Sequence, residues 1–389
     1  MRITVKPPSG LRRGLGAGLL ALLLVGAAGQ VAADEPTIVQ IAAGNWHSCA
    51  LDDTGQVWCW GRNSWGQLGD GTLVQRMRPV PVSGLSDVVA IAAGGSHSCA
   101  VHDDGRVFCW GSNALGALGD NTFTDRQTPV QVRNMGNAGG LVAAGERHSC
   151  VLRGPGRVAC WGANSDGRLG DGTFQGRPRP GNVRRLQNVA DIAAGGSHGC
   201  AVRPNGRAFC WGNNLQGQLG DDTLINRNIR VPVQGLNNAV RIDVAGFHSC
   251  AVRATGRVAC WGANDSGQLG DGTQANRRVP ANVLGLRDAR QVAAGRRHSC
   301  AVRDTGDVAC WGSNNSGQIG DGTLIQRREA TEVQRIGNAT QVAAGLNHSC
   351  ALRANGRVFC WGSNSHGQIG DGTLQQRLRP RLVDFPLAP

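Results

Sequence analysis

Short apolar stretches alternate with turn residues along nearly the whole chain, and beyond the N-terminal region no segment has the period of an amphipathic helix. Residues 48–51 and 57–60 are apolar runs that flank the turn sequence Asp52-Asp53-Thr54-Gly55, which predicts a β-hairpin. Residues 80–82 form a short run that contains a proline, and residues 89–93 form a further apolar run. The pattern predicts four short strands in about fifty residues.

This pattern occurs seven times. A His-x-Cys motif recurs every 50 residues, with one step of 51, from His47 and Cys49 to His348 and Cys350. Each copy continues with Cys-Trp-Gly, an Asn, a Leu/Ile-Gly-Asp-x-Thr turn and an Arg. A fixed period of about 40–50 residues is typical of a propeller or a solenoid, and four strands make one propeller blade. We therefore expect residues 34–389 to form a single all-β domain, a seven-bladed β-propeller of four-stranded blades.

The two ends of the repeat array suggest how the ring closes. The first copy begins at the predicted strand 38–43, with no proline-containing strand before it, and the last copy ends with Pro380-Arg381-Leu382-Val383. We expect this C-terminal strand to complete the first blade, because a closed ring leaves no free strand edges.

Residues 1–33 have the features of a secretory signal peptide. Four basic residues precede an apolar run at 15–28, and the small residues Val31-Ala32-Ala33 lie just before Asp34. The apolar run is too short to span a membrane, which takes about 20 residues. A disordered basic arm and a twin-arginine signal at Arg12-Arg13 are the alternatives. We expect a secreted or periplasmic protein without a membrane span.

Composition agrees with a β-rich globular protein. The chain of 389 residues has 59 Gly, 14 Cys and 10 Trp, and its 17% charged residues exclude a disordered chain or a coiled coil. The formal net charge is +13, and it stays strongly positive without the four basic residues of the predicted signal peptide.

The cysteines occur two per copy, ten residues apart. In a hairpin that turns at Thr54, Cys49 lies opposite Cys59 on the same face, at a separation that a disulfide accepts. A metal site of His47, Cys49 and Cys59 is the alternative, but it lacks the usual spacing of zinc ligands. We expect no metal, no cofactor and seven disulfides: Cys49–Cys59, Cys99–Cys109, Cys150–Cys160, Cys200–Cys210, Cys250–Cys260, Cys300–Cys310 and Cys350–Cys360.

The polar residues that recur in every copy are predicted to be structural. Seven identical catalytic sites around a ring are implausible, and His47 and Ser48 are strand neighbours that point to opposite faces, so they cannot form a nucleophile–base pair. We expect Asp70 to bind turn amides, and the recurring His and Arg to bond the neighbouring blade. Trp60 and its equivalents should pack between blades. We therefore expect no enzymatic activity.

Function should lie where the copies differ. The most variable positions precede the repeated His or follow the repeated Asn, in loops at strand ends, and loops on a rigid scaffold often form binding surfaces. Neutral loop positions, or stacking of Trp46 on Trp65, are the alternatives. We expect one binding face with exposed apolar and charged residues: Trp46, Trp65, Leu115, Glu146, Arg147, Phe247, Arg296, Arg297, Leu346 and Asn347.

A second set of arginines lies at the predicted hairpin turns. These residues could attract an anionic surface or nucleic acid, but no aromatic residues that could stack on bases are interleaved with them, so a solvated rim is the simpler interpretation. The set comprises Arg153, Arg157, Arg203, Arg207, Arg253, Arg257, Arg303, Arg353 and Arg357.

The repeated unit His-Ser-Cys-Ala-Leu, Gly-x-Val-x-Cys-Trp-Gly-x-Asn and Gly-Gln-Leu-Gly-Asp-Gly-Thr resembles the regulator of chromosome condensation repeat over nearly all of residues 34–389. The resemblance implies a seven-bladed propeller. It also implies two reference functions: nuclear members are exchange factors for a small GTPase that use a protruding insertion, and secreted bacterial members include a β-lactamase inhibitor that binds through loop aromatics. This chain has no long insertion between its copies.

These observations favour a secreted, non-enzymatic scaffold that binds a protein or an anionic envelope polymer through one face. Guanine-nucleotide exchange on a small GTPase and inhibition of an enzyme such as a β-lactamase are the alternatives that the resemblance implies. We expect a monomer, and nucleic acid is the less favoured partner.

Overall fold

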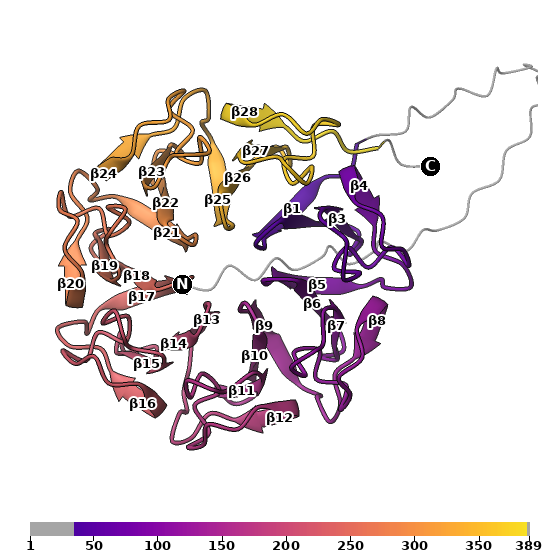
Figure 1. The fold of residues 1–389 in the computed structure, drawn as a ribbon, viewed down its shortest axis with the longest axis horizontal. Helices are drawn as coiled ribbons and strands as arrows, with labels where there is room; N and C mark the ends of the chain where they lie inside the picture. Colours follow the sequence, from indigo (N-terminus) through magenta and orange to yellow (C-terminus); the bar gives the residue numbers. More distant parts are fainter. Residues whose placement is uncertain (1–34, 387–389) are drawn as a thin grey trace, which may run out of the picture.

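The computed structural model describes residues 35–386, so the predicted signal peptide at 1–33 lies outside the described residues. The described chain forms twenty-eight strands in seven antiparallel sheets of four, arranged as a ring (Figure 1). The prediction of an all-β, seven-bladed propeller is confirmed. Between residues 35 and 386 there is no helix that is long and apolar enough to cross a membrane.

The blades follow one another in sequence, and their strands have the following bounds. Blade one contains β1 Ile38–Ala43, β2 His47–Asp52, β3 Val57–Gly61 and β4 Arg76–Pro81; blade two contains β5 Val88–Ala93, β6 His97–His102, β7 Val107–Gly111 and β8 Arg126–Gln131; blade three contains β9 Ala138–Ala144, β10 His148–Arg153, β11 Arg157–Gly162 and β12 Arg177–Asn182. Blade four contains β13 Asp191–Ala194, β14 His198–Val202, β15 Ala208–Gly212 and β16 Arg227–Pro232; blade five contains β17 Ala239–Val244, β18 His248–Arg253, β19 Val258–Gly262 and β20 Arg277–Asn282. Blade six contains β21 Ala289–Ala294, β22 His298–Arg303, β23 Val308–Gly312 and β24 Arg327–Glu332; blade seven contains β25 Ala339–Ala344, β26 His348–Arg353, β27 Val358–Gly362 and β28 Arg377–Leu382.

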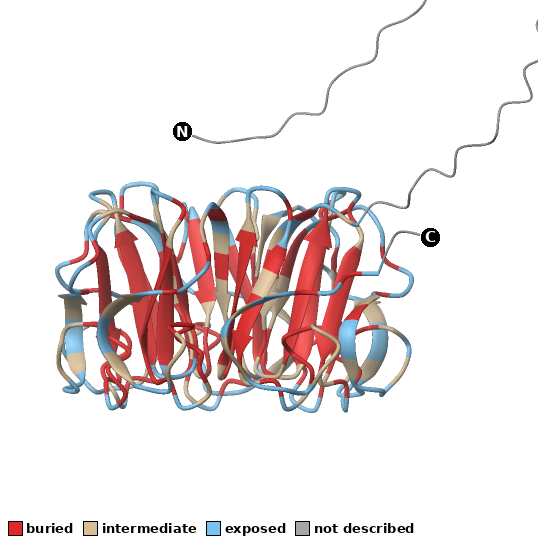
Figure 2. Ribbon diagram, turned by 90° about the horizontal axis from the view of Figure 1, so that it is seen from above, coloured by how far each residue is buried: buried red, intermediate tan, exposed pale blue. Residues whose placement is uncertain are grey.

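Within a blade the strands pair in sequence order, from the innermost strand at the channel to the outermost strand at the rim. Because neighbouring strands are antiparallel, the β1–β2 and β3–β4 connections begin and end on one side of the ring, and the β2–β3 hairpins lie on the other. We call these sides the loop face and the hairpin face. Figure 2 shows the strands running between two layers of loops, with the exposed residues concentrated in those loops.

Ring closure differs from the prediction. The C-terminal strand β28 pairs with β27 and completes the seventh blade, whereas the first blade is built from the contiguous strands β1 to β4. The first and last blades lie side by side (Figure 1) and are joined by side-chain packing. Phe385, just after β28, packs edge-on against Trp58 and Trp60 of the first blade. Side-chain contacts between the first and last blades, and not strand exchange, therefore close this ring.

The core lies between the blades. The seven tryptophans of the Cys-Trp-Gly motifs are fully buried, and each packs on the preceding blade. Trp110 Nε1, for example, donates a hydrogen bond of 2.9 Å to the backbone carbonyl of Gln67 in the first blade. The prediction that these tryptophans pack between blades is confirmed.

All seven predicted disulfides are present. Each joins directly opposed residues of the hairpin between the second and third strands of a blade, as in the pair Cys49↔Cys59, with Cα atoms 4.0–4.1 Å apart. The sulfur atoms of Cys49 and Cys59 are therefore not available as thiolate ligands, and the alternative metal site is excluded. Seven buried disulfides indicate an oxidising environment, as outside the cell or in the periplasm.

Candidate binding face

The β3–β4 loop of each blade is fixed by a recurring polar network. In the first blade, Asp70 Oδ1 accepts hydrogen bonds from Asn63 Nδ2 and from the Thr72 backbone N–H, both at 3.0 Å. Arg76 Nε donates to Asp70 Oδ2 at 2.9 Å. The predicted role of Asp70 in binding turn amides is confirmed. The prediction that the recurring Arg bonds the neighbouring blade is wrong for Arg76, which bonds within its own blade.

The network favours the ionised carboxylate. Burial raises the pKa of Asp70, but the hydrogen bonds from Thr72 and Arg76 outweigh burial and hold the pKa below its ordinary value. The loop is thus held by charge-assisted hydrogen bonds, which are the stronger kind. Residues carried on it are presented from a rigid support.

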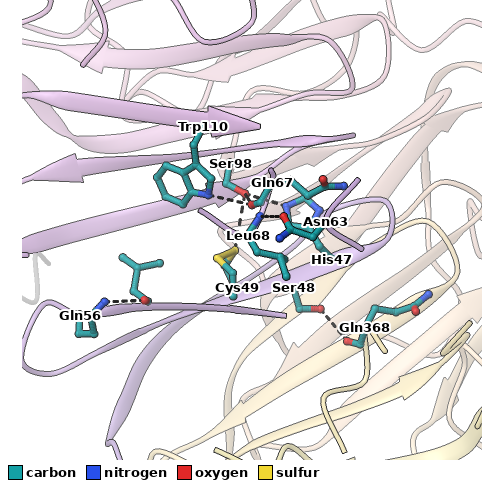
Figure 3. Close-up of a disulfide and its surroundings, with 12 residues drawn as sticks. His47, Ser48, Cys49, Gln56, Asn63, Gln67, Leu68, Ser98, Trp110 and Gln368 are labelled. Carbon is teal, nitrogen blue, oxygen red and sulfur yellow. Dashed lines mark hydrogen bonds between the residues drawn. A yellow bond between two sulfur atoms is a disulfide. The ribbon is translucent and has the colours of Figure 1, made fainter. Parts of the chain in front are cut away.

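The repeated His and Ser join adjacent blades. His47 Nε2 lies 2.9 Å from Ser98 Oγ of the second blade, and the ring is closed by His348 Nε2, 2.9 Å from Ser48 Oγ. Six of the seven joints have this pair. Figure 3 shows Ser98 and Trp110 converging on the Gln67 carbonyl between the blades. The prediction that the repeated His bonds the neighbouring blade is confirmed.

In these pairs the histidine donates the hydrogen bond and the serine accepts it, whereas a nucleophilic serine would donate to its general base. Ser98 Oγ donates its only proton to the Gln67 carbonyl at 2.9 Å, so His47 Nε2 must donate to Ser98. Burial, together with the neighbouring His97 and His348, lowers the pKa of His47 to about 3. Both side chains are almost fully buried. The pair therefore acts as a neutral structural link.

The joint between the third and fourth blades lacks this link. Gly199 occupies the position of the serine, and within residues 35–386 neither ring nitrogen of His148 has a hydrogen-bond partner. A Cβ atom at residue 199 would lie 2.9 Å from Trp211 Cε2, so the indole already fills the space of the serine side chain. Arg168, in place of the usual Gln, reaches across this joint to the Gly196 carbonyl at 3.0 Å. This joint is thus held by different contacts.

We expect Ser299→Ala to lower the free energy of unfolding by about 1–3 kcal/mol, because it leaves the buried Nε2–H of His248 without an acceptor. Chemical unfolding at pH 7.5 measures the change. The exposed Ser86 gives the matched control, since Ser86→Ala should change stability by less than about 0.5 kcal/mol. Equal effects of the two variants would show that the inter-blade pair does not stabilise the ring.

All ten predicted binding residues lie in loops between the first and second or the third and fourth strands of a blade, hence on the loop face. Trp65 and Phe247 are 44% and 40% exposed, and Leu115 is also exposed. Arg147, Arg296 and Arg297 are exposed on the same face. Glu146 and Arg296 line the mouth of the central channel, as expected for the positions that precede the repeated His, while Asn347 is half-buried. The role of these residues in binding stays a prediction.

Two of these residues, Trp46 and Leu346, are less exposed than predicted. Leu346 is only 7% exposed, so it offers little surface to a partner. Trp46 is half-buried: the guanidinium carbon of Arg62 lies 4.9 Å from its ring centroid, and the edge of His366 contacts it across the joint between blades one and seven. Trp46 therefore packs on these two residues and does not use Trp65 for support.

A second set of exposed apolar residues in the loops between third and fourth strands was not among the predicted binding residues. They lie one or two positions after the Thr of the Gly-Asp-x-Thr turn, and Phe123, for example, is 60% exposed. The signal was present in the sequence as an apolar residue after that Thr in six of the seven copies. The exposed members are Leu73, Val74, Phe123, Phe174, Leu224, Ile225, Leu324, Ile325 and Leu374.

The innermost strands enclose a channel of about 860 Å³, lined mainly by small residues and by backbone. Two carboxylates break its symmetry. Asp191 Oδ2 accepts the backbone N–H of Ile242 at 3.0 Å, and Asp243 Oδ2 accepts that of Ala294 at 2.8 Å. Burial raises the pKa of Asp191 to about 6 and that of Asp243 to about 7. Both carboxylates thus brace neighbouring blades.

The predicted arginine set lies on the hairpin face. Arg153, Arg203, Arg253, Arg303 and Arg353 are half-buried, and several bind nearby groups: Arg203 Nε donates to the Gln187 carbonyl, for example, and Arg303 pairs with Asp288. Arg157, Arg207, Arg257 and Arg357 are exposed. Part of the set is therefore structural, and the rest is a basic rim.

Within the described part of the chain, one group combines three side chains that could ligate a metal: His102, Asp103 and Asp104, in the second blade. The cluster is largely exposed, and Asp104 is paired with Arg106 at 2.6 Å. The arginine competes with a cation for this carboxylate, so the cluster is poorly suited to hold a metal.

Fold and loop networks together define a repeat propeller with one rigid, partly apolar loop face. The model described as RCC1-like domain matches residues 75–388, and the regulator of chromosome condensation (RCC1) repeat matches residues 38–67. The chain therefore belongs to the RCC1-like domain family.

Solved structures resemble the whole ring. The structure of Prp20p from Saccharomyces cerevisiae is 24% identical, covers 86% of this chain and 87% of that chain, and has a TM-score of 0.76. Human WBSCR16 is 25% identical, covers 82% of this chain and 87% of that chain, and has a TM-score of 0.73. At 24% identity, the likeness to Prp20p indicates a shared fold and carries no statement about function.

Sequence similarity to curated relatives is confined to short segments. E3 ubiquitin-protein ligase HERC2 from Homo sapiens is 46% identical over 48 residues, which is 12% of this chain and 1% of that protein. The matched segments span 1–4% of the length of the curated relatives. They indicate a shared repeat unit and say nothing about ligase activity.

Proposed function

We propose that this protein is a secreted, non-enzymatic scaffold that holds a protein partner on its loop face. The observation that supports this most is the set of exposed apolar side chains on the loop face. Trp65 and Phe123 lie on loops fixed by Asp70-type networks, and Phe247 lies on the short loop between β17 and β18. Exposed apolar surface bordered by polar groups is typical of protein-binding surfaces, and aromatic and arginine side chains are frequent hot spots.

Secretion is supported by two independent features. The seven disulfides need an oxidising compartment, and residues 1–33 have the pattern of a secretory signal peptide. An anionic envelope polymer would be a less suitable occupant of the loop face, because a polymer of that kind selects for charge and not for exposed phenylalanine and leucine.

We test the proposal with a photo-crosslinking amino acid at position 115 on the loop face and, as a control, at position 89. Val89 is 51% exposed but lies at the far end of β5 from the loop face. In the envelope and medium of the source organism, position 115 should give one reproducible protein adduct and position 89 none.

The adduct's partner is then purified for a binding titration. The double variant Trp65→Ala/Phe247→Ala should weaken its affinity by about 30-fold or more, as expected for the loss of a hot spot, whereas Val89→Ala should leave it unchanged. Equal affinities of all three proteins would overturn the loop-face proposal. If the captured partner is an enzyme such as a β-lactamase, and binding lowers its activity, the scaffold acts as an inhibitor.

Guanine-nucleotide exchange is the second candidate, because the fold neighbour Prp20p was characterised for its binding to Gsp1p. An exchange factor accelerates nucleotide release from a GTPase. A fluorescent-nucleotide release assay with small GTPases tests it, and acceleration would replace the secreted-scaffold proposal.

A further inference from the structure

The joint between the third and fourth blades carries a cluster of arginines on the hairpin side of the ring. Arg203 and Arg207 lie in the hairpin of blade four, Arg230 lies in its outermost strand, and Arg185 lies in the connection from blade three. Arg230 comes from the β16 strand and Arg185 from another blade, so the cluster appears only in the folded ring.

Two of these arginines stack on the same aromatic side chain, Phe209. The guanidinium carbons of Arg203 and Arg230 lie 4.7 and 4.3 Å from the centroid of Phe209, which is itself buried. Each also donates its Nε–H to the connection between the blades, Arg203 to the Gln187 carbonyl at 3.0 Å and Arg230 to the Arg185 carbonyl at 2.7 Å. Stacking and one bond fix each guanidinium and leave its terminal N–H groups to other partners.

The positive charge of this cluster is not neutralised within residues 35–386. Partial burial lowers the pKa of Arg230, and the neighbouring charges that lower it further are Arg203, Arg207 and Arg185. In two other blades a carboxylate neutralises the hairpin arginine: Arg303, at the position equivalent to Arg203, pairs with Asp288, and Arg106 pairs with Asp104. Four cations that repel one another are stabilised by a bound anion.

We propose that Arg185, Arg203, Arg207 and Arg230 form a binding site for a tetrahedral oxyanion, namely a phosphate or sulfate group. The planar guanidinium fork suits the oxygens of such groups, and two prepositioned forks reduce the entropy lost on binding. This site lies apart from the loop face, so it would let the scaffold hold a phosphorylated or sulfated ligand while its loop face holds a protein.

The test uses inorganic phosphate and sulfate as probes at constant ionic strength, with chloride as the balancing anion. Arginine Nε–H resonances of the full-length mature protein are followed by NMR during the titration. We expect saturable shifts of the Arg203 and Arg230 signals, and an affinity weakened by about tenfold or more in Arg203→Gln/Arg230→Gln. Arg303→Gln, which removes an arginine already paired with Asp288, should bind as the wild type does.

Arg207→Gln keeps the proposal testable should the double variant fail to fold, because Arg207 is exposed and its side chain makes none of the bonds to the blade connection. It should weaken phosphate binding by about threefold. NMR shifts that never saturate would overturn the site. Equal phosphate affinities of the wild type and Arg207→Gln, and of the double variant if it folds, would also overturn it. Titrations with tripolyphosphate and a sulfated disaccharide then distinguish a phosphate ligand from a sulfate ligand by which binds more tightly.

Discussion

Acidification from pH 7 to pH 5 should unfold the ring, because seven histidines are buried without charge. Burial lowers the pKa of His47, His198 and His298 to about 3 and that of His97, His248 and His348 to about 4, and it also lowers the pKa of His148. In the unfolded chain these groups titrate near 6.5. Their stabilising contribution is complete above pH 6.5 and is lost as the pH falls toward the folded values.

Two channel carboxylates act in the opposite direction. The pKa values of Asp191 and Asp243 are raised by burial to about 6 and about 7, so their contribution is complete below pH 3.8 and is lost as the pH rises through those values. Near pH 5, unfolding therefore takes up seven protons on histidine and releases two from aspartate. A net uptake of about five protons lowers stability by about 7 kcal/mol per pH unit, against a typical total of about 5–15 kcal/mol.

Tryptophan fluorescence and chemical unfolding between pH 8 and pH 4 measure this loss, since seven tryptophans are fully buried in the folded ring. His102→Gln is the control, because His102 lies outside the inter-blade pairs and its variant should keep the same pH dependence. Stability that stays constant between pH 7 and pH 5 would contradict the neutral, buried state of the histidines.

Reduction of the disulfides should have an effect of similar size. Each disulfide closes a loop with a sequence separation of 10, which restricts the unfolded chain by about 3 kcal/mol in the chain-entropy model. Seven such loops together exceed the usual stability of a domain, even when the contributions add only in part. We therefore expect the fully reduced chain to be unfolded at 37 °C.

The half-cystines are almost completely buried, so reduction itself needs the ring to open. A reductant should act slowly on the native protein and rapidly in denaturant, as measured by thiol counting and far-UV circular dichroism. The variant Cys49→Ala/Cys59→Ala should still fold, with a lower melting temperature. A fully reduced protein that melts within a few degrees of the oxidised one would show that packing alone maintains the ring.

Much of the fold could be predicted because each repeat encodes one blade. The apolar runs predicted the first three strands of a blade to within a residue, and the spacing of Cys49 and Cys59 across a turn predicted the disulfide. The fourth strand was placed less well, because β4 begins at Arg76, four residues before the apolar run at 80–82. Ring closure could not be predicted from a repeat pattern, because a proline-containing strand at the C-terminus fits either the first or the last blade. Only the position of β28 beside β27 decides between them.

The candidate surfaces were harder to predict for a physical reason. Exposure does not follow from the position in the repeat: Arg296 and Leu346 both lie two residues before the repeated His, but only Arg296 is exposed. The link between His47 and Ser98 joins two blades, so it depends on the ring geometry, which a single repeat does not contain. The stacking of Arg203 and Arg230 on Phe209 lies within blade four, but only the folding of that blade brings these three residues together.

The most direct test of the loop-face account is amide hydrogen exchange of the mature protein with and without the partner captured at position 115. The account predicts protection of loops on the loop face, including the β3–β4 loop at 62–75 and the β17–β18 loop at 245–247, with no change in the hairpin at 203–207. Protection confined to the hairpin face, with the loop face exchanging as in the free protein, would contradict it.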